Sequence, residues 1–192
     1  MNEIKSRDRI FKSGLAELSF HLNKKEEKDM YKKIMVPLDG SDVAECVLPH
    51  VKAFIKGFNI SEVLLVRVVE PVKPDLRVYD NIFNEDFIRQ AHKIWKDIEQ
   101  QEKTSARNYL EQVSEQLKRK GTTIRSKVLV GNDEAKNLAD CAESSGADLI
   151  IMATHGYSGI ARWVTGSVAE KLFRSAGVTV LMVRAAEAGG GV

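Results

Sequence analysis

Short apolar runs alternate with amphipathic stretches along most of this chain, and that alternation constrains the fold more than any other feature. Five runs have the length and composition of β-strands: 33–38, 62–69, 123–130, 148–154 and 178–183. The stretches between them show the apolar spacing of helices: 42–56, 84–120, 133–145 and 167–176. Parallel strands need crossover connections, which helices supply. The order therefore predicts an α/β domain whose parallel sheet has helices on both faces.

Two of the runs are expected at the edges of this sheet. The run 123–130 carries Arg125 and Lys127 among its apolar residues, as a strand with one wet face does. The last run, from Val178 to Val183, would also be an edge strand if it joins the sheet last, yet it is almost wholly apolar. Proteins normally cover an apolar edge. We therefore expect a homodimer in which this last strand forms the subunit contact.

The chain is expected to divide into three parts. Residues 1–30 form an extension, helical or partly disordered, residues 31–185 form the α/β domain, and residues 186–192 form a flexible tail. The stretch 84–120 is either one very long helix or two shorter ones. A single helix would reach about 50 Å, so its first half is expected to project or to pack on something extra. The apolar stripe of the extension is the candidate: Ile10, Phe11, Leu15, Leu18 and Leu22.

Composition excludes several classes of protein. The formal net charge of +2 is too small to indicate a nucleic-acid or membrane surface. No apolar stretch approaches the length of a bilayer span, and the N-terminus shows no secretory signal. The two cysteines, Cys46 and Cys141, have neither disulfide nor metal-ligand spacing. We expect a cytoplasmic protein with no nucleic-acid partner, no membrane partner and no protein-bound metal.

Ligands of open parallel sheets bind beyond the carboxyl ends of the strands, where the strand order reverses. The fourth run leads through residues 153–159 to Gly166 and to Ser167, which opens a helix. A glycine before a helix N-terminus leaves free N–H groups and a positive dipole end for a phosphate. A capping box of Ser167 with Glu170 would explain the same residues. Neither the P-loop pattern nor the dinucleotide fingerprint is present.

The same region resembles the nucleotide-binding signature of the universal stress protein family, which is Gly-x-x-Gly, nine residues, Gly-Ser/Thr. Here the pattern reads Ala153-x-x-Gly156, nine residues, Gly166-Ser167. The opening KIMVPLDGS, the later VLVG and the closing GSVAEKLFRSAGVTVLMVR resemble the family too, so the resemblance covers roughly residues 31–185. It implies a sheet of five parallel strands in the order 3-2-1-4-5, dimers through the last strand and, in some members, ATP binding.

The resemblance also implies roles for individual residues. Those that match the positions around adenine and ribose are Pro37, Leu38, Asp39 and Val69. Those that match the positions around the ribose and phosphates are Met152, Ala153, Gly156, Gly166, Ser167 and Val168. His155 lies in the same loop and is expected near the phosphates rather than in catalysis, because no nucleophile or carboxylate in that loop pairs with it. Asp39 would accept ribose hydroxyls, although a turn carboxylate would stand at the same place.

Three hypotheses for the function follow. The first is an ATP-binding universal stress protein that takes ATP with magnesium and serves as a regulatory or stress-response dimer. The second is a slow ATP hydrolase acting as a switch, although the sequence shows no carboxylate cluster for two-metal chemistry and no clear water-activating base. We assign no catalytic residue. The third is a nucleotide-free interaction protein of the same fold, which Ala153 favours because its methyl group replaces the first glycine of the signature.

Overall fold

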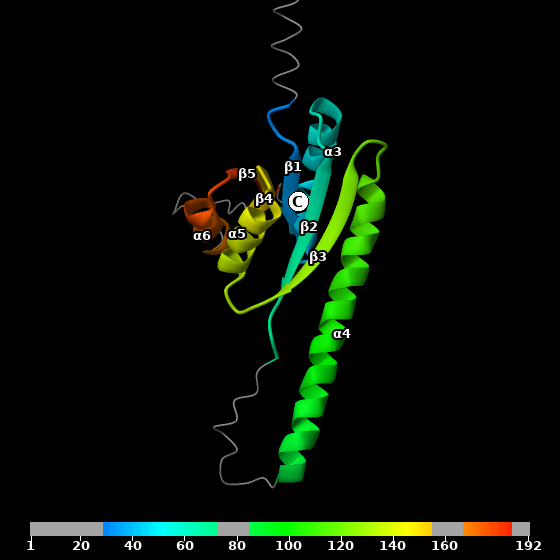
Figure 1. Ribbon diagram of the computed structural model, residues 1–192, viewed down its shortest axis with the longest axis vertical. Helices are drawn as coiled ribbons and strands as arrows, with labels where there is room; N and C mark the ends of the chain where they lie inside the picture. Colours follow the sequence, from blue (N-terminus) through cyan, green and yellow to red (C-terminus); the bar gives the residue numbers. More distant parts are fainter. Residues whose placement is uncertain (1–28, 73–84, 155–166, 186–192) are drawn as a thin grey trace, which may run out of the picture.

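The computed structural model describes residues 29–72, 85–154 and 167–185 (Figure 1). The predicted extension before residue 29, the tail from residue 186, and the loop residues His155, Gly156 and Gly166 lie outside this described part. The strands are β1 (Lys33–Pro37), β2 (Glu62–Val69), β3 (Thr123–Val130), β4 (Leu149–Thr154) and β5 (Thr179–Arg184). The helices are α2 (Asp42–Glu45), α3 (Leu48–Gly57), α4 (Glu85–Leu117), α5 (Glu134–Ser145) and α6 (Ser167–Ser175).

The strands form one parallel sheet in the order β3-β2-β1-β4-β5, which confirms the predicted topology. β1 is central and pairs with β2 on one side, Lys33 opposite Glu62, and with β4 on the other, Ile34 opposite Leu149. β3 lies at one edge with Arg125 and Lys127 exposed, as predicted from their charges. β5 lies at the opposite edge. The strand order therefore reverses between β1 and β4.

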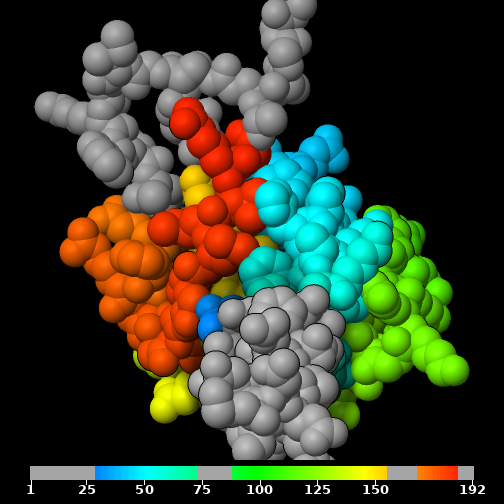
Figure 2. All heavy atoms as spheres, turned by 90° about the horizontal axis from the view of Figure 1, so that it is seen from above, coloured from blue at the N-terminus to red at the C-terminus, as the bar shows by residue number. Residues whose placement is uncertain are grey.

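Alternate side chains of a strand point to opposite faces of the sheet, and each face has its own core. On one face, Ile34 and Val36 of β1 belong to a buried cluster with residues of α3 and α4. On the other face, Met35 belongs to a cluster with Leu138 of α5 and Leu172 of α6. Figure 2 shows the result from above, with α4 (green) and α6 (orange) on opposite sides of the molecule. The helices on the two faces thus pack against alternate residues of the same strands.

The first helical stretch differs from the prediction, which placed one helix over residues 42–56. The structure has two helices there, because α2 ends at Glu45 and α3 begins at Leu48. Pro49 lies at the start of α3. A proline in a continuous helix would lack its N–H donor and would press its ring against the carbonyl four residues earlier, which belongs to Glu45. The break places that proline where a helix tolerates it.

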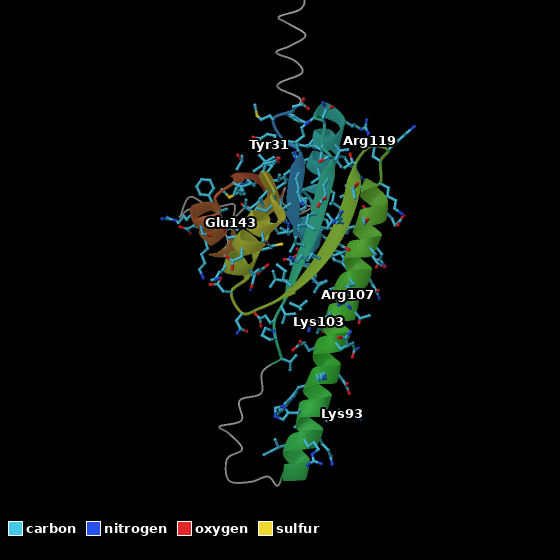
Figure 3. The ribbon with its side chains drawn as sticks, in the orientation of Figure 1. Tyr31, Lys93, Lys103, Arg107, Arg119 and Glu143 are labelled. Carbon is cyan, nitrogen blue, oxygen red and sulfur yellow. The ribbon has the colours of Figure 1, made fainter. Side chains whose placement is uncertain are left out.

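The long stretch is one uninterrupted helix, α4, of 33 residues. At 1.5 Å per residue it is about 50 Å long. It runs antiparallel to the strands, and its inner half lies along the sheet with four residues at most 2% exposed: Ala106, Leu110, Val113 and Leu117. Its outer half extends past the carboxyl edge of the sheet, where Figure 3 labels Lys93. Within the described residues, no helix combines the length and apolarity needed to cross a membrane.

Candidate functional site

The loop between β1 and α2 is shaped by its own side chains. The Leu38 amide donates to the carbonyl of Val66 at 2.8 Å, which extends the β1–β2 pairing by one residue. The Asp39 carboxylate then accepts from the Ser41 amide at 2.8 Å, and the Ser41 hydroxyl accepts from the Ala44 amide at 3.1 Å as the N-cap of α2. Two short polar side chains therefore close consecutive turns. Asp39 itself remains exposed at the carboxyl edge of the sheet.

Gly40 adopts a backbone conformation that this loop requires. Its φ is +90°, a region that side chains with a Cβ rarely adopt. A Cβ built there would lie 3.0 Å from Nη1 of Arg67 on β2. The guanidinium of Arg67 in turn lies over the ring of Tyr109 on α4, with Cζ 5.4 Å from the ring centroid. The loop that carries Asp39 therefore packs against a cation–π pair that joins β2 to α4.

Tyr109 lies in a polar but enclosed position. Its hydroxyl is buried and has no hydrogen-bond partner among the described residues. Burial raises the pKa of Tyr109 strongly, and the nearby charge of Glu45 on α2 raises it further, whereas Arg67 lowers it. Glu45 is thus close enough to act electrostatically without the geometry of a hydrogen bond. Tyr109 consequently stays a neutral phenol at physiological pH.

A cavity of 240 Å³ opens beside this loop, at the carboxyl ends of β1 and β4. Its walls come from the ends of both strands, the start of α2 and the first turns of α5 and α6. The lining residues are Pro37, Leu38, Asp39, Ser41, Val43, Ala44, Glu134, Leu138, Met152, Ala153, Thr154, Val168 and Ala169. This is the point at which the strand order reverses, where open parallel sheets bind their ligands.

The structure brings six of the predicted site residues together at this cavity: Pro37, Leu38, Asp39, Met152, Ala153 and Val168. Val69 is a buried residue at the end of β2 and does not belong to the cavity lining. Ser167 begins α6, next to the lining residue Val168. The remaining predicted residues, His155, Gly156 and Gly166, lie outside the described part of the chain.

Glu134 is a lining residue that the sequence reasoning missed. It is the first residue of α5, whose N-cap is Asp133, with the Asp133 carboxylate accepting from the Lys136 amide at 3.2 Å. Burial raises the pKa of Glu134, and the negative charges of Asp39 and Glu70 raise it further. An acidic residue there also suits the positive end of the helix dipole, so the sequence carried no separate signal for a site.

The described lining contains two carboxylates, Asp39 and Glu134, and neither lysine, arginine nor histidine. The carboxylates can accept hydrogen bonds from hydroxyl groups, and Leu38, Val43 and Met152 offer apolar walls for a flat ring. A polyanion would meet repulsion here unless a cation or a helix N-terminus offsets it. Within the described part of the chain, no group of three or more His, Cys, Asp or Glu residues could hold a metal ion.

The fold and the cavity together define a doubly wound α/β protein with a cavity at the switch point of its sheet. The model that defines the universal stress protein family matches residues 30–184, which is most of the chain. The chain belongs to the universal stress protein family, as its signature predicted.

Several curated relatives and solved structures are similar to this chain over most of their own length. Universal stress protein MJ0531 of Methanocaldococcus jannaschii is 32% identical over 157 residues, 82% of this chain and 84% of the relative. Universal stress protein Sll1388 of Synechocystis is 31% identical over 155 residues, 80% of this chain and 98% of the relative. The solved structure of MJ0577 has a TM-score of 0.63 at 28% identity and covers 83% of this chain and 99% of its own. A universal stress protein solved in complex with cAMP shares the fold, with a TM-score of 0.51 at 20% identity over 80% of this chain and 97% of its own.

Proposed function

We propose that this protein binds ATP, as a magnesium complex, in the cavity at the switch point and acts as a regulatory or stress-response dimer. The observation that carries the proposal is the convergence of three separate segments on one cavity. Residues 37–39, residues 152–153 and Val168 were singled out from the resemblance to the family, and all of them line the cavity. The cAMP complex of a protein with the same fold supports an adenine nucleotide as the class of ligand.

Each wall of the cavity has a role in this proposal. Asp39 uses one carboxylate oxygen for the Ser41 amide, and its remaining acceptor capacity would take the ribose hydroxyls. The apolar side chains of Leu38 and Met152 would contact the adenine ring. The phosphates would lie toward the start of α6 near Val168, where the helix dipole is positive. Magnesium, when bound with ATP, supplies positive charge to the phosphates.

The acidic lining is the reason to propose the magnesium complex rather than free ATP. Free ATP would approach Asp39 and Glu134 with its full negative charge, and like charges at short range repel. Burial and the negative charges of Asp39 and Glu70 raise the pKa of Glu134, so this wall of the cavity already disfavours negative charge. Both effects favour a ligand whose charge is already reduced.

The homodimer through the last strand also remains a proposal. β5 is an edge strand, and Val180, Leu181 and Met182 on it are only half-buried within one chain. An apolar edge of this kind offers unpaired backbone groups and apolar side chains to a second copy. A twofold axis beside β5 would cover both at once.

Isothermal calorimetry with purified protein, magnesium and ATP tests the ligand. We expect a dissociation constant in the micromolar range, which corresponds to roughly 7 to 9 kcal/mol. Asp39→Asn keeps the shape of the side chain and its turn, and we expect it to weaken binding about tenfold, the loss of one charge-assisted hydrogen bond. Ala153→Gly restores the family residue and is expected to hold or improve affinity.

The same titration distinguishes ATP binding from the competing hypothesis of a nucleotide-free interaction protein. Absence of heat for both wild type and Ala153→Gly at millimolar ATP, with no nucleotide-dependent shift in thermal melts, would contradict nucleotide binding. The nucleotide-free interaction protein would then be the better description of this chain.

A further inference from the structure

Glu134 brings to the cavity a carboxyl group that is half-buried. It lies four residues before Leu138, which is 1% exposed and lines the cavity too. Residues four apart share one face of a helix, so Glu134 stands on the face of α5 that packs toward the sheet. Within the described part of the chain, no hydrogen bond or ion pair engages this carboxyl group, whereas the carboxylate of Asp39 already accepts from the Ser41 amide.

The cavity has two ends, each at the start of a helix. α5 packs on β2 and α6 packs on β4, and β1 lies between those two strands with Asp39 after it. Glu134 is on the β2 side, because the charge of Glu70, which directly follows β2, acts on it. Val168 is on the β4 side, in the first turn of α6. Asp39 therefore lies between an α5 end and an α6 end.

The two ends differ in charge. Both helix starts carry the positive end of a helix dipole. At α5 that positive end is offset by the N-cap Asp133 and by Glu134. At α6 the acidic residue of the first turn, Glu170, forms an ion pair with Arg174, with Oε1 2.9 Å from Nη2. Phosphates are therefore favoured at the α6 end, and a ribose at Asp39 would leave the base at the α5 end.

A hydrogen-bond acceptor at the α5 end distinguishes one purine from another. Adenine attached to ribose has one donor group, the amino group on C6, and its ring nitrogens are acceptors. A carboxyl group can accept from that amino group in its charged and in its protonated form. Burial and the charges of Asp39 and Glu70 raise the pKa of Glu134, and a donor bonded to the carboxylate would offset that cost. A purine without the amino group would leave this half-buried acceptor unpaired, which weakens binding.

We propose that Glu134 selects the base, because its carboxyl group accepts a hydrogen bond from the C6 amino group of adenine. This role rests on the proposed function, since it requires a nucleotide in the cavity with its phosphates at the α6 end. The same side chain then acts in two ways: it pairs with the amino group at the α5 end, and its acidity keeps the phosphates at the opposite end.

Calorimetry with ATP and with purine riboside triphosphate, which lacks only the C6 amino group, tests this role in the full-length protein with magnesium. We expect wild type to bind ATP about tenfold more tightly, the effect of one hydrogen bond to a charged group. Glu134→Ala and Glu134→Leu remove the acceptor and are expected to bind the two ligands equally. Loss of the charge changes the repulsion of both triphosphates alike, so the ratio of the two dissociation constants isolates the contact with the base. Glu134→Gln keeps an amide oxygen and is expected to keep a preference for ATP.

Glu143→Ala is the matched control, because Glu143 is an exposed glutamate of the same helix and does not line the cavity (Figure 3). It is expected to keep the wild-type ratio. Circular dichroism checks the fold of each variant, and whichever of the alanine and leucine variants folds decides. Equal binding of both ligands by wild type, or a ratio unchanged by loss of the acceptor, overturns the role of Glu134 and leaves ATP binding standing. Absence of ATP binding by wild type overturns the proposed function, and the role of Glu134 with it.

Discussion

At the scale of single residues, one side chain in the loop after β1 both closes a turn and supplies a proposed binding group. Asp39 closes its turn with one oxygen and remains exposed at the cavity with the rest of its carboxylate. Gly40 permits that turn through its positive φ, and Arg67 fills the space beside it. The position of Asp39 therefore depends on a glycine that contacts no proposed ligand.

Gly40→Ala tests that dependence. Alanine is strained at a φ of +90° and its methyl group would meet Arg67 at 3.0 Å, so we expect a loss of about 1 to 2 kcal/mol in the free energy of unfolding. Gly121 is a matched control, since its φ is +92° and nothing lies within 4 Å of a Cβ built there. Denaturant unfolding measures both variants, and calorimetry measures their ATP affinity.

Gly121→Ala is expected to lose about 1 kcal/mol and to keep its ATP affinity, while Gly40→Ala loses more stability and binds ATP more weakly. Equal losses in the two variants, with affinity unchanged in both, would show that Arg67 does not constrain the loop.

Some of these single-residue features could be predicted from the sequence, and others could not. Asp39 was found because it follows a buried strand directly, and any residue there must lie at the carboxyl edge of a parallel sheet. Glu134 follows a loop and a cap, and whether the first residue of a helix faces a cavity depends on how that helix is rotated on the sheet. The contact of Arg67 with Gly40 and Tyr109 joins three elements that are distant in the sequence. No local pattern encodes such a contact.

At the scale of elements, the strands were predictable because most of them are buried on both faces and read as continuous apolar runs. β2 and β3 have the bounds that their composition predicted. The break between α2 and α3 was missed because apolar spacing continues through Pro49, and periodicity alone outweighed the steric rule for proline. The two edges of the sheet differ in kind: β3 is polar and charged, and β5 is apolar.

That difference predicts how the two edges respond to a new charge. Leu181→Lys on β5 would place an ammonium group where a second copy is proposed to pack, so we expect the particle mass in multi-angle light scattering to fall by half. Ser126→Lys is the control on the opposite edge, because Ser126 is exposed on β3. It is expected to leave the mass unchanged. A wild-type mass insensitive to Leu181→Lys would contradict the β5 dimer.

At the scale of the whole molecule, the distribution of charge bears on which form of the proposed nucleotide the cavity would bind. The formal net charge of the chain is only +2, while the described cavity lining is acidic. General attraction of anions by the protein surface is therefore weak. Whatever offsets the phosphates of the proposed ligand would therefore act locally, from the start of α6 or from a cation bound with the nucleotide.

Thermal melts with and without magnesium test this balance. At ATP concentrations 100-fold above the dissociation constant, binding adds about 2.7 kcal/mol of stability, which raises the melting temperature of a chain of this size by roughly 5 to 11 °C. We expect that shift with magnesium and a clearly smaller one with excess EDTA. Equal shifts in the two conditions would show that the acidic lining does not select the metal complex.

The long helix α4 offers a route by which binding of the proposed ligand could affect contacts made elsewhere on the protein. The inner half of α4 holds Tyr109 against Arg67, and Arg67 packs beside the loop that carries Asp39, while Ile94 and Ile98 on the outer half of the same helix are exposed. Such an element couples two binding equilibria only if binding at one end changes the contacts made at the other, and the coupling is then reciprocal by thermodynamic necessity. Any factor by which contact on the outer half changes nucleotide affinity must reappear, unchanged in size, as the factor by which nucleotide changes that contact. If nucleotide binds as proposed and shifts α4 through Tyr109 and Arg67, nucleotide binding and any contact made by the outer half of α4 would form one linked equilibrium.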